Sequence, residues 1–307
     1  MPLLLEQSQK LSNNLLVAGV IEEIIDKDEL FALFPFLGIQ GKAYVYNREA
    51  TISEGAFISP STNANPGGDV VPEEASTFTE VVAKLRVLAG DVDVDKFLDA
   101  TLGDTNNQKA IQIAQKARGL ARKFRRTLAI GDTSVNAKEF DGVAKLCDAG
   151  QVISAGTNGA AMTLTLLDEL IDAVPNGADV LMMRSGTLRA FRAMLRLMGG
   201  TTPETIMIEN FGRPLPAHNG TPIIINDFLP KNETKGSNSD TTSVYAMRLN
   251  EVDGLHGIYG GESAGIVVED IGTVQNKDAT RTRLKWYCGT ALKSTMSMAR
   301  IDGITNV

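Results

Sequence analysis

A possible catalytic serine lies in the segment Gly261-Glu262-Ser263-Ala264-Gly265, which fits the G-x-S-x-G pattern of α/β-hydrolases. That chemistry needs a strand before the serine, a helix after it, then an acid and finally a histidine. Residues 266–274 (IVVEDIGTV) read as a strand instead, and both histidines, His218 and His256, precede Ser263. The sequence therefore predicts a glycine-rich turn at this position and no hydrolase.

Other patterns that could support chemistry also fail. Gly150, Gly156 and Gly159 have the wrong spacing for a dinucleotide-binding loop, and no G-x-x-x-x-G-K-[ST] phosphate loop occurs. Cys147 and Cys288 form no CxxC motif or Cys/His cluster, so we expect neither a disulfide framework nor a zinc site. We expect no catalytic site, no cofactor and no bound metal, and we interpret the protein as not an enzyme.

An acidic run resembles a calcium loop only faintly. Counted from Asp91, the sixth and twelfth positions of an EF-hand loop would be Lys96 and Leu102, where glycine and glutamate are required. We instead expect Asp93 or Asp95 to cap a short helix that follows directly.

Composition places the chain among ordinary water-soluble proteins. Its 307 residues are 43% hydrophobic and 22% charged, with a net charge of −7. The acidic balance argues against a dedicated nucleic-acid binder. Acidic and basic residues interrupt the apolar N-terminal stretch at 15–39, so we expect no signal peptide and no contact with a membrane.

Residues 43–58 and 76–88 form a predicted long β-hairpin. The returning segment alternates apolar and polar positions from Thr79 to Val87, which is typical of a half-buried strand. The polar connection at 59–75 is too long for a simple turn, and two strands alone are only marginally stable. Two interpretations follow: an arm lying on a neighbouring subunit, or a hairpin folded over its own domain.

A long helix is predicted at 106–128, preceded by a shorter one at 14–26 and by aromatic residues at 31–37 that should anchor the N-terminal region. The outer face of the long helix carries five cations: Arg118, Arg122, Lys123, Arg125 and Arg126. Two interpretations of this face are possible. It is exposed to solvent or contacts another protein surface, or it binds phosphate groups.

The second half of the chain alternates helices and strands and then becomes rich in strands. Helices are predicted after a capping box at Thr165–Asp168 and after a cap at Ser185. Strands are predicted at 180–183, 205–208, 222–226, 243–249, 265–269 and 281–288, with a polar, mobile loop at 231–242.

The order of these elements resembles a known family. Ile130-Gly131-Asp132 and Phe140-Asp141-Gly142-Val143 follow the long helix, and the passages NGTPIIINDFLP (219–230) and GIYGGESAG (257–265) come later. Together they resemble the major capsid proteins of tailed bacteriophages, which have the Hong Kong ninety-seven fold. The resemblance covers nearly the whole chain, and its specificity lies in the order of the motifs.

The resemblance implies an α+β fold in five parts. They are an N-arm (1–41), an extended hairpin called the E-loop (42–90), a P-domain with a long spine helix (91–160), an α/β A-domain (161–265) and P-domain return strands (266–307). It further implies assembly of pentamers and hexamers into an icosahedral virion capsid, in the host bacterial cytoplasm, around double-stranded DNA held without sequence specificity. The intersubunit residues at the E-loop tip would be Phe57, Pro60, Pro66, Gly67, Gly68, Glu73 and Glu74.

Two departures from the family pattern shape the expected partners. Some members join a lysine of this arm covalently to a neighbour, but residues 59–75 contain none, so we expect no such crosslink. The early start of the first helix leaves no room for a long scaffolding segment, so we expect a separate scaffolding protein, besides a portal and a decoration protein. We expect the basic face of the long helix to contact a neighbour's arm, for example at Glu73 and Glu74.

Two alternatives remain open. An encapsulin-type nanocompartment shell shares the fold but encloses proteins, and an uncharacterised enzyme with an α/β insert belongs to another class altogether.

Overall fold

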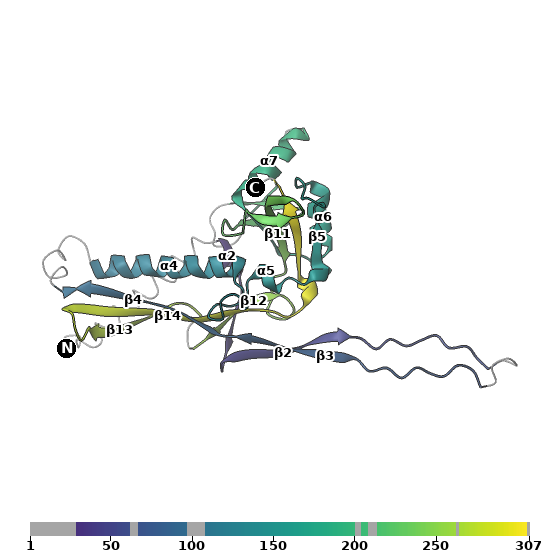
Figure 1. Ribbon diagram of the computed structural model, residues 1–307, viewed down its shortest axis with the longest axis horizontal. Helices are drawn as coiled ribbons and strands as arrows, with labels where there is room; N and C mark the ends of the chain where they lie inside the picture. The colour runs from purple at the N-terminus through teal and green to yellow at the C-terminus, as the bar shows by residue number, and fades with distance from the viewer. Residues whose placement is uncertain are drawn as a thin grey trace.

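A computed structural model describes residues 29–61, 67–96, 108–199, 204–207, 214–261 and 264–305. Some predictions lie outside these ranges: the helix expected at 14–26 and the residues Pro66 and Ser263. The helix expected after Asp95 also lies outside them, apart from Lys96. The molecule is an elongated body from which a long two-stranded arm projects (Figure 1).

A five-stranded sheet forms one half of the body. Its strands are β1 (Phe36–Ile39), β12 (Leu255–Gly260), β14 (Ala279–Leu292) and β13 (Val267–Thr273) in that order, with β4 (Arg86–Asp95) on the other side of β14. The long β14 organises this sheet, because it pairs antiparallel with β4, β12 and β13. The predicted alternation is confirmed: Leu284, Trp286 and Cys288 are buried, whereas Tyr287 is exposed.

Helix α4 (Gln108–Ile130) lies along this sheet (Figure 1) and confirms the predicted long helix. Its apolar stripe faces β14, and the rings of Phe124 and Trp286 lie 4.7 Å apart between their centroids. Phe31, in α2 (Glu29–Leu33), packs against both rings at tilted angles, and Phe34 is buried beside them. The expected anchoring of the 31–37 segment is thus confirmed for Phe31 and Phe34, and the core of this half forms where helix, sheet and segment meet.

An eight-stranded sheet forms the other half. It runs β5 (Val152–Ser154), β15 (Met298–Ile304), β11 (Asn238–Met247), β6 (Val180–Met183), β9 (Thr221–Ile225), β8 (Pro214–His218) and β7 (Glu204–Met207), with β10 (Glu233–Lys235) beside β11. Two helices, α6 (Leu164–Asp172) and α7 (Ser185–Leu197), pack on it and bury Leu167, Leu170 and Phe191. Short helices α5 (Val143–Leu146) and η1 (Ala149–Gln151) lie between α4 and β5 in the chain, and η2 (Thr295–Ser297) lies between β14 and β15.

The arm is a separate sheet of two strands, β2 (Ala43–Thr51) and β3 (Thr77–Lys84). The antiparallel register opposes Ala43 to Lys84 and Thr51 to Thr77, which confirms the predicted hairpin. The returning ribbon does not end at residue 88, because β4 follows β3 after the single residue Leu85 and continues into the body.

Three local predictions were wrong. Thr163, not Thr165, caps α6, because its hydroxyl accepts a hydrogen bond from the Leu166 amide. Ser185 is the first residue of α7, and the Asp227 carboxylate accepts its amide hydrogen. The polar segment 231–242 is no irregular loop, since it holds β10 and the start of β11.

The α+β class is confirmed, whereas the five-part division stays a prediction. The sheets cross two of its bounds: β12, within the expected A-domain, pairs with β14, and β15, within the expected return strands, pairs with β11. None of the described helices is long and apolar enough to cross a membrane.

Candidate subunit interface

The arm extends far beyond its paired strands (Figure 1). Past Thr51 and Thr77 its two runs are joined by side-chain contacts, such as those from Ser53 to the Ser76 hydroxyl and to the Glu74 carbonyl. Nearer the tip, the Asp69 carboxylate accepts a hydrogen bond of 2.7 Å from the Ser59 amide. Such short, exposed contacts shape the arm without giving it a core of its own.

Large apolar side chains along the arm lie in solvent. Phe57 and Val70 are 108% and 91% exposed, and Ile52, Val71 and Phe78 are each more than 60% exposed. Burial of apolar surface is worth about 25 cal/mol per Å², so a surface of this kind gains stability by contacting another molecule. The arm therefore has the character of an interface left open in the single chain.

The tip residues expected at a subunit contact are all on this surface where the structure describes them. Phe57, Pro60, Gly67, Glu73 and Glu74 are exposed, and Gly68 is half-buried. Gly67 and Gly68 have φ angles of +102° and +76°, and the Ser59 carbonyl oxygen would lie 2.9 Å from a Cβ atom at Gly68. Glycine is thus required for the tip to turn back on itself.

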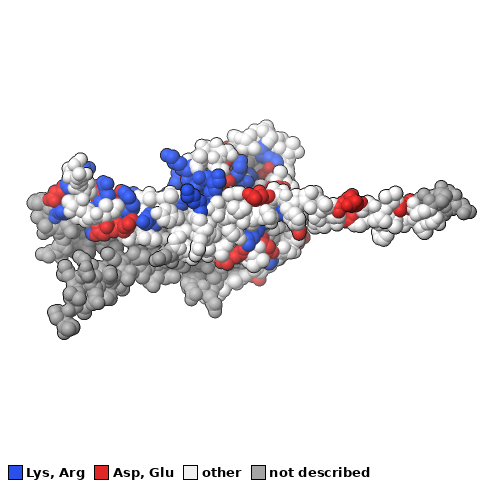
Figure 2. All heavy atoms as spheres, turned by 90° about the horizontal axis from the view of Figure 1, so that it is seen from below, with Lys and Arg blue, Asp and Glu red and all other residues white. Residues whose placement is uncertain are grey.

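Beyond Arg48 and Lys84 at its base, the arm carries charge of one sign. Between Glu49 and Ala83 the sequence holds six carboxylates and no lysine or arginine: Glu49, Glu54, Asp69, Glu73, Glu74 and Glu80. Figure 2 shows this contrast, because the arm displays only acidic side chains on the visible face while basic ones gather on the body.

The base of the arm is tied to the body. The Tyr46 hydroxyl donates a hydrogen bond of 2.6 Å to the carbonyl of Leu292, and Arg48 donates to the carbonyls of Leu292 and Lys293. The ammonium group of Lys293 in turn lies 5.5 Å from the centre of the Tyr44 ring. These contacts fix the direction in which the arm leaves the body.

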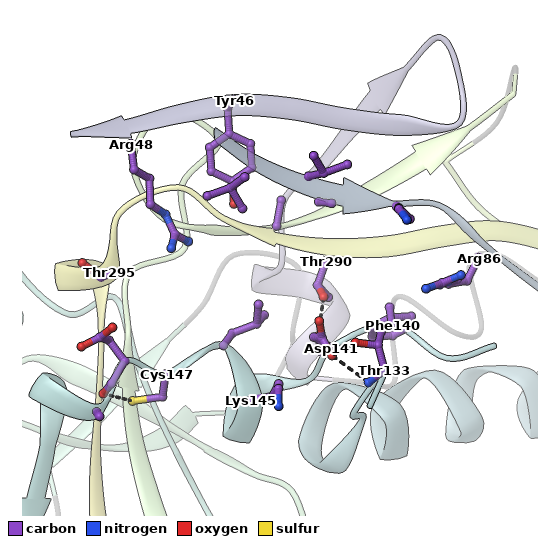
Figure 3. A pocket seen from close by; sticks show the side chains of 18 residues that line it. Tyr46, Arg48, Arg86, Thr133, Phe140, Asp141, Lys145, Cys147, Thr290 and Thr295 are labelled. Carbon is purple, nitrogen blue, oxygen red and sulfur yellow. Dashed lines mark hydrogen bonds between the residues drawn. The ribbon is translucent and has the colours of Figure 1, made fainter. Parts of the chain in front are cut away.

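A cleft of about 520 Å³ lies beneath this junction, between the arm, α5 and β14 (Figure 3). Asp141 lines the cleft and is held in place by three hydrogen bonds. Its carboxylate accepts two from Thr133, and its main-chain carbonyl accepts one from the Thr290 hydroxyl. Burial raises the pKa of the Cys147 thiol, which lines the cleft, to about 11. The thiol is therefore protonated at neutral pH and is a poor nucleophile.

The basic face of α4 contacts other parts of its own chain. The Arg122 guanidinium lies 5.6 Å from the Phe228 ring, Lys123 forms a 2.5 Å ion pair with Glu139, and Arg125 donates to the carbonyl of Ile225. The other two cations of the expected face, Arg118 and Arg126, are exposed. Arg122, Lys123 and Arg125 thus contact their own chain, which the helical spacing alone could not indicate.

A row of ion pairs missed by the sequence analysis lies on the five-stranded sheet. Arg283 and Arg281 on β14 each bind a β4 carboxylate, Asp91 and Asp93 respectively, with two hydrogen bonds of 2.6–2.8 Å. These hydrogen bonds hold the pKa of both carboxyl groups below the usual value. Asp93 therefore stabilises strand pairing and does not cap a helix.

Both histidines contact side chains of other elements in the described chain. Nε2 of His218 lies 2.8 Å from the Asp168 carboxylate on α6, and His256 is buried beside Tyr44. The described chain resumes after Ser263 with strand β13, where a nucleophile elbow would require a helix. In the described residues no group of three or more His, Cys, Asp or Glu side chains could hold a metal ion.

Comparison with family models and with curated proteins gives no match. Solved structures do match. The encapsulin SrpI of Synechococcus elongatus PCC 7942 superposes with a TM-score of 0.71 at 18% identity, covering 91% of this chain and 88% of the other. The capsid of an empty GTA particle gives 0.66 at 12% identity (90% and 89%), and Microbacterium phage Oxtober96 gives 0.62 at 12% identity (90% of each).

These superpositions span almost the whole chain, so they establish its overall architecture. The chain has the Hong Kong ninety-seven fold, as the order of its sequence motifs predicted. It is the fold of shell-forming proteins, both phage capsids and encapsulins.

Proposed function

We propose that this protein is the subunit of a closed shell that assembles from many copies of the same chain. The observation that carries the proposal is the arm, whose apolar side chains, Phe57 and Val70 above all, lie uncovered in the single chain. A neighbouring copy supplies the missing cover, and the hydrophobic effect then drives assembly. The role is structural and involves no catalytic step.

Within this class we favour the capsid of a tailed bacteriophage, built of pentamers and hexamers around double-stranded DNA in the bacterial cytoplasm. The long Pro- and Gly-containing tip and the likeness to a GTA capsid and to phage shells support this assignment. The net charge of −7 suits a container that holds DNA without gripping it, because many phosphate contacts would bind strongly. A separate scaffolding protein, a portal and a decoration protein complete the proposed set of partners.

The arm and the spine helix have complementary charge. We assign the acidic arm of one copy to the basic face of α4 in the next, where Arg118 and Arg126 remain exposed. Pairing of opposite charges at an interface fixes register and orientation more than it adds affinity.

A second candidate is an encapsulin-type shell that encloses proteins. The superposition on an encapsulin, with a TM-score of 0.71 and 18% identity, favours it. The contents discriminate: shells purified from the native host would hold DNA in the first case and a cargo protein in the second.

Electron microscopy and analytical ultracentrifugation of the purified protein, alone and with a co-expressed scaffold, test the proposal. We expect rings or closed shells for the natural chain and a smaller species for the double variant Phe57→Ser, Val70→Ser. Val135→Ser is the matched control, since Val135 is 85% exposed but lies on the body. A natural chain that stays monomeric in both settings would contradict the proposal.

A further inference from the structure

Helix α7 presents a stripe of positive charge to solvent. Arg189, Arg192 and Arg196 stand three and four residues apart, so they share one face, and all three are exposed. The adjoining face of the helix is fixed in the core through Leu188 and Phe191. The stripe is thus held rigidly outward.

Repulsion among the three charges of this stripe is offset within one chain only at Arg196, which lies in the last turn of the helix and donates a hydrogen bond to the Arg192 carbonyl. Like charges spaced i, i+3 and i+4 on a helix repel each other, and the first turn of α7 holds no acidic residue. Among the ion pairs of the described residues none includes Arg189, Arg192 or Arg196. A compensating group outside the chain would remove this cost.

Helix α6 carries an exposed face of the opposite charge. Glu169 and Asp172 share one exposed face in its last turn, where the helix dipole is negative and no basic residue is present. The neighbouring Asp168 is already held by His218 and Asn219, whereas Glu169 and Asp172 take part in no ion pair of the described residues. Two carboxylates thus stand where a cation would be favourable.

The basic stripe of α7 and the acidic face of α6 do not pair with each other within one molecule. Both helices pack on the eight-stranded sheet, yet Figure 1 shows α6 along one edge of the body and α7 rising above it. No ion pair joins them in the part of the chain that the structure describes. A second copy of the chain carries both faces and therefore offers each face an oppositely charged partner.

We propose that the basic stripe of α7 (Arg189, Arg192, Arg196) on one copy docks against the acidic face of α6 (Glu169, Asp172) on the next copy. The contact joins two different faces head to tail. Contacts of this kind produce a closed ring when the rotation between successive copies adds up to a full turn. The inference rests on the proposed shell function and adds the residues that fix the order of copies within one ring.

Charge exchange tests the pairing. Arg192→Glu and Glu169→Arg are made singly and together, and the yield of rings or shells is measured by ultracentrifugation. Each single variant places like charges in every contact of the ring, so we expect its yield to fall at least ~10-fold. The double variant restores opposite charges, and we expect its yield to return close to that of the natural chain.

Lys138→Glu and Asp278→Lys are the matched controls, because both residues are exposed and lie outside the eight-stranded sheet, in the turn after α4 and in the turn between β13 and β14. Circular dichroism and thermal melting show that each variant folds. Unchanged yields in the single variants, or no recovery in the double variant, would overturn the pairing while natural shells still support the proposed function. Shells of Arg192→Glu with normal yield but less nucleic acid would instead assign the α7 stripe to nucleic acid and also overturn it.

Discussion

The hydroxyl of Tyr46 lies 2.6 Å from the main-chain carbonyl oxygen of Leu292, a contact between residues 246 positions apart. Through it the first strand of the arm is attached to the last residue of β14, the strand that organises the five-stranded sheet. Burial raises the pKa of Tyr46 above its ordinary value, so the hydroxyl remains a donor at neutral pH. The direction of the arm is thus set by the core of the body.

Removal of this hydroxyl should loosen the arm. For Tyr46→Phe we expect a loss of about 1 kcal/mol in the free energy of unfolding, typical of one hydrogen bond. Hydrogen exchange of the β2 and β3 amides should also become faster. Tyr44→Phe is the control, since its hydroxyl makes no hydrogen bond among the described residues. Equal exchange in both variants would show that Tyr46 does not hold the arm.

Acid should weaken the strand pairing of β4 with β14. The hydrogen bonds from Arg283 and Arg281 lower the pKa of Asp91 and Asp93 below the ordinary value of 3.8. Because the carboxylates are more acidic when folded, their stabilisation is complete above that ordinary pKa and is lost as pH falls through the lower folded values. We expect the free energy of unfolding to decline below about pH 4.

Asp91→Asn separates this effect from general acid denaturation. The variant should be less stable than the natural chain at pH 7, and the difference should shrink in denaturant titrations near pH 3. Asp240→Asn, at an exposed carboxylate that contacts no arginine in the described residues, should change neither value. A difference for Asp91→Asn that stays constant with pH would contradict the linkage.

The sequence predicted the parts of the fold that depend on periodic burial. The alternation of Leu284, Trp286 and Cys288 and the stripe of α4 needed no knowledge of their partners. Segment 231–242 was misjudged because its composition is polar, yet Thr241 and Thr242 are buried. Their hydroxyls donate to the carbonyls of Glu233 and Pro230, so tertiary hydrogen bonds replace the apolar signal.

The candidate interface was predictable only in outline. A lysine-free tip and a basic helix face can be read from residue types. The hydrogen bond from Arg125 to the carbonyl of Ile225 cannot, because it joins two residues 100 positions apart. The pairing of Asp91 with Arg283 spans 192 positions and follows from strand register, which no local pattern records. The exposure of Phe57 likewise depends on the path of the arm away from the body, which no local pattern records.

The turn after the spine helix should not tolerate a side chain at Gly142. A Cβ atom there would lie 2.6 Å from the carbonyl oxygens of Thr127 and Leu128. We expect Gly142→Ala to lower the free energy of unfolding by about 1–3 kcal/mol, as overpacking typically does. Thermal or chemical denaturation measures this loss. Gly119→Ala is the control, because nothing lies within 4 Å of its Cβ position on α4, and it should stabilise by about 0.5–1 kcal/mol. Equal melting of the two variants would contradict the packing.

Charge reversal at Arg126 tests the contact between arm and spine helix. Arg126 is a better choice than Arg122 or Arg125, whose side chains contact Phe228 and the carbonyl of Ile225 in their own chain. We expect Arg126→Glu to reduce shell yield several-fold, while nucleic acid per shell stays constant. Lys138→Glu serves as the control at an exposed body position. Loss of nucleic acid at normal yield would instead place this face against DNA.

The lysine-free tip should leave assembled shells without covalent links through the arm. An isopeptide bond needs a lysine amine, and the nearest ones, Lys42 and Lys84, lie at the base, where Lys84 pairs with Ala43. Shells boiled in detergent should therefore migrate on a gel as one monomer band. An added amine-reactive crosslinker provides the positive control, because it should produce a ladder from the same shells. A ladder without crosslinker would show that another lysine reaches a neighbour and that the arm does not hold by packing alone.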